Sequence, residues 1–114
     1  MVEMDCLFCK IVDGSIPASI VKQTEKVTAF NDISPQAPTH VLIIPNQHFE
    51  NMGRVAEADP ELAGEILKVT SAIAKDLGLD SWRINANTGV SAGQSVFHAH
   101  IHLMGGRTFA WPPG

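Results

Sequence analysis

The sequence predicts an α+β fold: a five-stranded antiparallel sheet with one long helix and one short N-terminal helix. Two segments place apolar residues at helical spacing, five short stretches carry the apolar patterns of strands, and the connections between them are local. The chain has 114 residues, which is enough for one hydrophobic core. We therefore expect a single domain over residues 1–114.

The two predicted helices differ in length. The short helix follows Asp5, a suitable N-cap, and Gly14 can close it. The long helix has Asp59 as its N-cap and Pro60 as its first residue, and it continues until Gly78. Apolar residues at helical spacing support both: Leu7, Phe8, Ile11 and Val12 in the first, and Leu62, Ile66, Val69, Ile73 and Leu77 in the second.

The five predicted strands cover residues 20–23, 26–31, 39–44, 81–87 and 98–104. The third is an almost continuous apolar run, which is typical of a strand covered on both faces. A polar loop with two prolines precedes it and is too stiff for a flexible linker. Gly89 and Gly93 lie in the loop before the last strand, where their backbone N–H groups could approach a ligand. Hairpin loops also use glycines, so this signal alone is weak.

Composition argues against several classes of protein. The net charge of -4 disfavours a non-specific nucleic-acid binder, which needs a basic surface. No apolar run approaches the ~20 residues that cross a bilayer. The segment formed by the first five residues is acidic, whereas a signal peptide begins with a basic region. We therefore expect a cytoplasmic protein without a membrane or nucleic-acid partner.

Three of the five histidines, His98, His100 and His102, lie two residues apart near the C-terminus. In a strand this spacing directs all three imidazoles to one face, roughly 6.6 Å apart, and directs the apolar residues between them into a core. Three packing histidines would each need a hydrogen-bond partner or carry a desolvation cost of roughly 1–3 kcal/mol. Since a neutral imidazole is a good nucleophile near pH 7, the row favours a reactive or ligand-binding site.

Four further residues are candidates outside this row. Cys6 and Cys9 lie three positions apart on the first helix, so both sulfurs could reach one ion. They could equally be small buried hydrophobic residues. His40 interrupts the third strand, and a structural role is the default for it. His48 lies just past the end of that strand and is the better candidate for function.

Residues 98–104 match the pattern His-x-His-x-His followed by two apolar residues, and further matches lie at 31–40, 87–89, 93–95 and 111–114. In these motifs the chain resembles the histidine triad (HIT) family, specifically its Hint-like nucleoside phosphoramidase branch with an N-terminal Cys-x-x-Cys. The matches run in the family's order over nearly the whole chain. The resemblance implies a HIT-like fold.

The resemblance further implies a hydrolase of purine nucleoside 5'-phosphoramidates, such as adenosine 5'-monophosphoramidate or an aminoacyl-adenylate. His100 would be the nucleophile that forms a covalent nucleotidyl-histidine, His102 would contact the α-phosphate, and Ser95 would relay a proton to the leaving amine. The implied nucleotide-binding residues are Asp32, Ile33, Asn87, Gly93, Gln94, Ser95, His102 and Trp111. A homodimer is also implied, in which the tail carrying Trp111 approaches the partner's site.

A structural zinc ion, bound by Cys6, Cys9, His48 and His98, is a further implication of the resemblance. These residues make a Cys₂His₂ set, a usual composition of closed zinc sites. Two alternatives remain open. Histidines of the 98–102 row could instead bind a catalytic zinc ion. The chain could also be a nucleotide-binding or zinc-stabilised interaction module that does not turn its ligand over.

Overall fold

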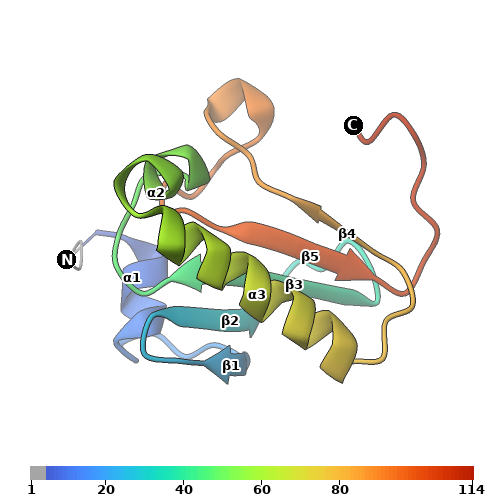
Figure 1. The fold of residues 1–114 in the computed structure, drawn as a ribbon, viewed down its shortest axis with the longest axis horizontal. Coiled ribbons are helices and arrows are strands. Elements are labelled where there is room, and N and C mark those ends of the chain that lie inside the picture. Colours follow the sequence, from blue (N-terminus) through green and yellow to red (C-terminus); the bar gives the residue numbers. More distant parts are fainter. Residues whose placement is uncertain (1–4) are drawn as a thin grey trace.

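Five strands form one antiparallel sheet in the computed structural model, which describes residues 5–114 (Figure 1). The strands lie in the order β1-β2-β3-β5-β4. Their bounds are β1 Ile20–Gln23, β2 Val27–Asn31, β3 Thr39–Pro45, β4 Trp82–Asn85 and β5 Ile101–Gly105. The helices are α1 Leu7–Val12, α2 Met52–Ala58 and α3 Pro60–Asp76, with a 3-10 turn, η1, at Val90–Ala92. The predicted α+β class and the five-stranded antiparallel sheet are confirmed.

Helix α3 covers one face of the sheet (Figure 1). Its start is set by Asp59, whose side chain accepts a hydrogen bond from the backbone N–H of Leu62, and by Pro60 in the first turn. The apolar stripe of α3 packs against alternate residues of the central strands and forms the main core. That core includes Ile66, Val69 and Ile73 of α3 and Val41, Ile43, Ala99, Ile101 and Leu103 of β3, β5 and the segment before β5. Within residues 5–114, no helix has both the length and the apolar character needed to cross a membrane.

The opposite face of the sheet carries α1 and the histidines. Phe8 of α1 packs there on Phe30, Leu42 and Ile44, which alternate along their strands with the residues of the main core. His102 lies on the same face, because it alternates with the core residues Ile101 and Leu103 and pairs with Leu42 across β3 and β5. The alternation predicted around the histidine row is therefore present, and the candidate site lies on the face away from α3.

The main differences between the predicted and the observed elements are four, and the other boundaries agree within one or two residues. Cys6, rather than Asp5, is the N-cap of α1, and its Sγ accepts a hydrogen bond from the backbone N–H of Cys9 at 3.3 Å. The short helix α2 was not predicted; it buries only Val55, so its apolar stripe is too short to recognise. Strand β5 begins at Ile101, and His98 and His100 precede it. Strand β4 ends at Asn85, two residues earlier than predicted.

Candidate functional site

A cavity of about 310 Å³ opens beside the histidines on the α1 face of the sheet. One wall is apolar and includes Leu7, Phe8 and Ile11 of α1. The polar part of the lining includes Asp32, Ser95, His100 and His102. Small-molecule sites of this size commonly combine apolar walls with a few polar groups that orient the ligand. With Ile33, which also lines it, the structure thus brings five of the residues predicted for the reaction and the nucleotide to one cavity.

His100 presents one free basic nitrogen next to this cavity. Its Nδ1–H donates a hydrogen bond of 2.7 Å to the backbone carbonyl of His98, so its Nε2 carries the lone pair. Burial lowers the pKa of His100 below its usual value, although the bond to the His98 carbonyl and the charge of Asp32 oppose the shift. The ring is therefore neutral at pH 7, which is the state that a nucleophile requires.

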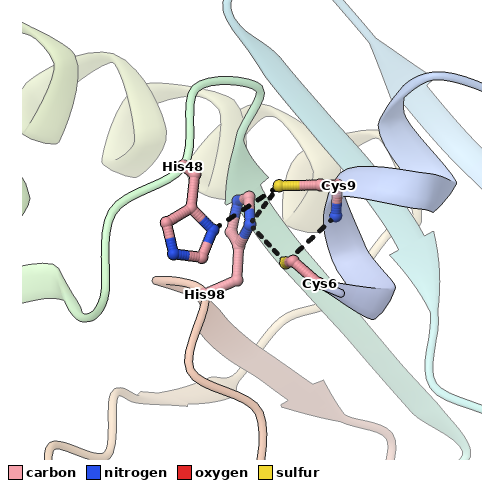
Figure 2. Close-up of side chains that lie close together, drawn as sticks. All are labelled: Cys6, Cys9, His48 and His98. Atoms are coloured by element: carbon pink, nitrogen blue, oxygen red, sulfur yellow. Dashed lines mark hydrogen bonds between the residues drawn. The ribbon is translucent and has the colours of Figure 1, made fainter. Parts of the chain in front are cut away.

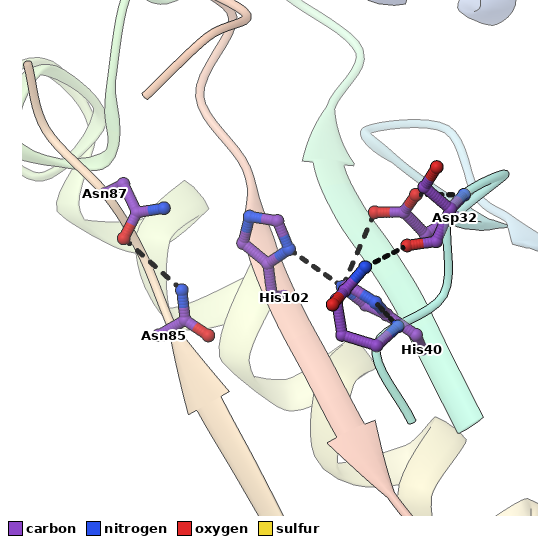
Figure 3. Close-up of polar contacts among 7 residues, drawn as sticks. Asp32, His40, Asn85, Asn87 and His102 are labelled. Carbon is purple, nitrogen blue, oxygen red and sulfur yellow. Dashed lines mark hydrogen bonds and ion pairs between the residues drawn. The ribbon is translucent and has the colours of Figure 1, made fainter. Parts of the chain in front are cut away.

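Hydrogen-bond partners also assign the tautomer of His102 (Figure 3). The backbone N–H of Gln36 donates to Nδ1 of His40 at 3.0 Å, so a neutral His40 carries its proton on Nε2. That Nε2–H donates to Nδ1 of His102 at 2.9 Å, with Oδ2 of Asp32 3.5 Å from the same nitrogen. His102 consequently keeps its own proton on Nε2, and burial lowers the pKa of His102 to about 4.

The sequence predicts a structural role for His40, and the structure adds that this buried side chain belongs to the histidine cluster. It contacts both His102 and Asp32. The alternation of residues along its strand places His40 on the same face as Leu42, opposite the core residues Val41 and Ile43. This face carries the other histidines of the cluster.

The loop before β5 is shaped by glycines and by one glutamine. Gly89 and Gly93 have φ values of 91° and 96°, which favour glycine. The buried side chain of Gln94 accepts from the N–H of Gly89 and donates to the carbonyls of Glu50 and Val96. The backbone N–H groups of Gly93 and Gln94 also donate within the loop, to the carbonyls of Val90 and Gly89. Gly93 and Gln94 therefore hold the loop in place.

Ser95 and Asn87 keep polar groups available. Ser95 is exposed, lines the cavity, and makes no hydrogen bond within residues 5–114. Asn87 accepts a bond of 3.4 Å from the side chain of Asn85, which leaves its own NH₂ group to donate. Figure 3 shows both asparagines beside His102, on the side away from His40. These groups can meet the oxygens of an anionic ligand.

The remaining two residues predicted for the nucleotide are exposed. Ile33 borders the cavity next to Asp32, with 99% of its surface accessible. Trp111 is 83% exposed and is not part of the cavity lining within the described chain. The tail before it is held by Arg83, whose guanidinium donates to the carbonyl of Ala110 at 2.9 Å.

Cys6, Cys9, His48 and His98 converge from three segments (Figure 2). Helix α1 and its N-cap supply the cysteines, the β3–α2 connection supplies His48, and the segment before β5 supplies His98. Nδ1 of His98 lies 3.2 Å from Sγ of Cys6 and 3.4 Å from Sγ of Cys9. Nδ1 of His48 lies 3.5 Å from Sγ of Cys9.

The chemistry of this set fits a four-coordinate zinc ion. Neighbouring nitrogen and sulfur ligands of tetrahedral zinc are about 3.6 Å apart, close to the distances found. The Nε2–H of His98 donates to the carbonyl of Pro45 at 2.8 Å, which directs the lone pair of Nδ1 toward the sulfurs. Burial lowers the pKa of His98 to about 4, so the ring is neutral as a ligand must be.

The three histidines of the row do not share one ligand position. His98 faces the cysteines, whereas Nδ1 of His102 faces His40. Among residues 5–114, His98, His100 and His102 do not form a group that could hold one ion. The geometry therefore does not support a catalytic zinc ion held jointly by these three histidines, whereas His102 forms a separate group of possible ligands with Asp32 and His40.

The fold and the site together define a class: an α+β protein with a histidine-lined cavity on one sheet face and a Cys₂His₂ cluster beside it. The model of the HIT domain matches residues 13–109. The chain belongs to the HIT family, which confirms the resemblance noted in its sequence.

Individual relatives agree with this assignment. A 14 kDa zinc-binding protein of Zea mays is 46% identical over 111 residues, covering 95% of this chain and 87% of the maize protein. A HIT family hydrolase from Clostridium thermocellum superposes with a TM-score of 0.91 at 40% identity, over 96% of each chain. Another from Legionella pneumophila Philadelphia 1 superposes with a TM-score of 0.93 at 46% identity, over 96% of this chain and 100% of that one.

Proposed function

We propose that the protein hydrolyses purine nucleoside 5'-phosphoramidates through a covalent nucleotidyl-His100 intermediate. One observation carries the proposal: the Nδ1–H of His100 is donated to the His98 carbonyl, so a neutral, unprotonated Nε2 remains on a ring that lines the cavity. The similarity to two solved structures described as HIT family hydrolases supports the hydrolytic part.

The chemistry proceeds in two displacements. Nε2 of His100 attacks the α-phosphorus, the P–N bond breaks, and the amine leaves with a proton relayed by the hydroxyl of Ser95. Water then attacks the phosphorus, which breaks the bond to His100 and releases a nucleoside monophosphate. The Nε2–H of His102 and the NH₂ group of Asn87 donate to the non-bridging oxygens, whose negative charge must be stabilised in both transition states.

The walls of the cavity suit a nucleoside. The apolar side chains of α1 and Ile33 can pack on the faces of a purine, while the carboxylate of Asp32 can accept hydrogen bonds from ribose hydroxyls. Gly93 and Gln94 contribute by holding the loop that presents Ser95. Within residues 5–114, no side chain with an amine or guanidinium lines this cavity, so the imidazoles and the donors of Asn87 and Ser95 must supply the hydrogen bonds to the phosphate.

The Cys₂His₂ set holds a structural zinc ion in this proposal. Support comes from the ligand distances and from the maize relative, which is described as a zinc-binding protein. When bound, zinc supplies cross-links between α1 and the sheet and takes no part in the reaction. Elemental analysis of the purified protein should find about one zinc per chain. Finding none, with both thiols freely reactive, would contradict this part.

We also propose that the working form is a cytoplasmic homodimer. Strand β4 is an edge of the sheet, and it exposes 43% of Trp82 and 42% of Ile84, an arrangement that invites a partner strand. In such a dimer the tail with Trp111 can reach the partner's cavity. Sedimentation should give twice the mass of one chain, and an Ile84→Lys variant should shift toward the monomer. An unshifted variant would place the interface elsewhere.

His100→Ala tests the function directly. Turnover of adenosine 5'-monophosphoramidate should vanish, because the variant lacks the proposed nucleophile, while the affinity for AMP should change little. His102→Gln is the matched comparison and should retain slow turnover. A His100→Ala variant that keeps its rate would refute the proposal. AMP binding by a wild-type protein that turns nothing over would favour the non-catalytic binding module.

A further inference from the structure

Helix α1 belongs to two sites at once. It contributes Cys6 and Cys9 to the Cys₂His₂ set, and between them in the sequence it contributes Leu7 and Phe8 to the cavity wall. Phe8 is 5% exposed, and its ring meets the ring of His100 edge-on at a centroid distance of 5.3 Å. It also lies 6.0 Å from the ring of His98. One aromatic side chain thus touches the proposed nucleophile and a proposed metal ligand.

Within residues 5–114, a small apolar cluster and the Cys₂His₂ set hold α1 against the sheet. With six residues it is too short to be a stable helix on its own. Its apolar contacts belong to the small cluster around Phe30, Leu42 and Ile44, on the sheet face away from α3, while the main core lies on the other face. Thiol groups are weak hydrogen-bond donors, so without metal the contacts of Cys6 and Cys9 with the imidazoles are weak. Coordination by a metal replaces them with strong bonds.

His98 provides a second connection between the sites. Its Nδ1 faces both sulfurs, and its backbone carbonyl accepts the Nδ1–H of His100 at 2.7 Å. Any change in the position of His98 therefore moves the acceptor that orients the nucleophile. The metal set consequently bears on the ring of His100 from two directions, through Phe8 and through this carbonyl.

We propose that metal occupancy of the Cys₂His₂ set and nucleotide occupancy of the cavity are energetically coupled through α1, with Phe8 as the positioning residue. A bound zinc ion holds the cavity wall in the geometry that fits a nucleotide. Because coupling between two binding sites is reciprocal, a bound nucleotide must raise the affinity for zinc by the same factor. The inference rests on the proposed function only in taking a nucleoside monophosphate as the ligand.

The test measures both sides of this coupling without measuring activity. AMP affinity is determined by calorimetry for zinc-loaded and chelator-stripped protein, and zinc affinity by chelator competition with and without AMP. We expect zinc to strengthen AMP binding about tenfold, within the range usual for coupled sites, and AMP to strengthen zinc binding by the same factor. Far-UV circular dichroism checks that the stripped protein keeps its sheet and α3.

Two variants on α1 separate positioning from simple loss of structure. Phe8→Leu removes the ring that contacts His98 and His100, so it should still bind one zinc ion but lose most of the coupling. Lys10→Ala lies on the same helix, outside the cavity lining and the metal set, and should couple like the wild type. The zinc-loaded variants remain informative even if the stripped protein unfolds, because the effect of AMP on zinc release from them reports the coupling.

The outcomes distinguish this inference from the proposed function. Equal AMP affinity in the loaded and stripped forms, or full coupling in Phe8→Leu, would overturn the coupling and leave the hydrolase proposal standing. Failure of the zinc-loaded protein to bind AMP at all would overturn both. Zinc affinity raised by AMP in the wild type and in Lys10→Ala, but not in Phe8→Leu, supports the inference.

Discussion

Lowering the pH should destabilise the wild-type protein more than a His102→Gln variant. In the fold His102 is partly buried, its Nδ1 accepts a hydrogen bond from His40, and its pKa is lowered to about 4, mainly by burial. In the unfolded chain its pKa returns to about 6.5. Between these values the unfolded state binds more protons than the folded state, so stability is complete above about pH 6.5 and is lost as the pH falls toward 4. His102→Gln removes the titrating group, so the variant should lose less stability than the wild type as the pH falls.

The magnitude follows from the two pKa values. Proton linkage predicts that the shifted pKa of His102 lowers the free energy of unfolding by almost nothing at pH 7 and by about 2 kcal/mol at pH 5. Because His102 keeps some contact with solvent, we expect about 1–2 kcal/mol. Urea unfolding of both zinc-loaded proteins at pH 7 and pH 5 measures it, and Glu57→Gln, which removes an exposed carboxylate, serves as control. Equal losses in wild type and His102→Gln would refute a neutral, desolvated His102.

Three further predictions concern the loop, the long helix and the core. Ser95→Ala should lower kcat about 100-fold for a phosphoramidate with a basic amine leaving group. It should lower kcat far less for a nucleoside p-nitrophenyl phosphate, because that leaving group needs no proton, and steady-state kinetics with both substrates measures the difference. Asp59→Ala should cost about 1 kcal/mol of unfolding free energy in urea titrations, because its Oδ1 caps α3 at the N–H of Leu62, and Asp59→Asn should restore most of it. Ile43→Ala, which empties a fully buried position, should cost about 2–5 kcal/mol, whereas Leu67→Ala on the exposed side of α3 should cost less than about 1 kcal/mol by thermal or urea unfolding.

The fold could be predicted where local signals and long-range packing agree. Helix α3 shows its start in Asp59 and Pro60 and its end in Gly78, which has a φ of 69°. Its apolar stripe packs into the core, so the capping residues and the apolar periodicity predict the same helix. Helix α2 has an N-cap in Asn51, whose side chain accepts from the N–H of Arg54, but it buries one residue only. In a sequence, an N-cap residue that is not followed by an apolar stripe of helical spacing cannot be distinguished from a turn.

In the candidate site, the spacing of residues along the sequence does not identify their partners. The spacing of His98, His100 and His102 indicates a shared face, but it does not say that the first faces two sulfurs and the third faces His40. Those partners lie 62 to 92 positions away in the sequence and are brought together by the β3–β5 pairing and by the docking of α1. For the same reason, the alternation of its strand can place His40 on the face of Leu42 but does not identify His102 and Asp32 as its partners.

The role of the loop before β5 is also set by contacts beyond the motif. Its glycines predict a close backbone approach, yet the N–H groups of Gly93 and Gln94 donate within the loop. The side chain of Gln94 reaches the carbonyl of Glu50, 44 positions away. What the motif presents to the cavity is Ser95.

Trapping the adduct tests the central claim most directly. Zinc-loaded protein in excess over labelled adenosine 5'-monophosphoramidate is quenched in alkaline denaturant, which preserves the acid-labile P–N bond, and its peptides are analysed by mass spectrometry. We predict a transient adenylyl group on His100 that forms and decays at rates consistent with turnover and is absent from His100→Ala. Single turnover of the substrate without any adduct on His100, or with the adduct on another residue, would contradict the account.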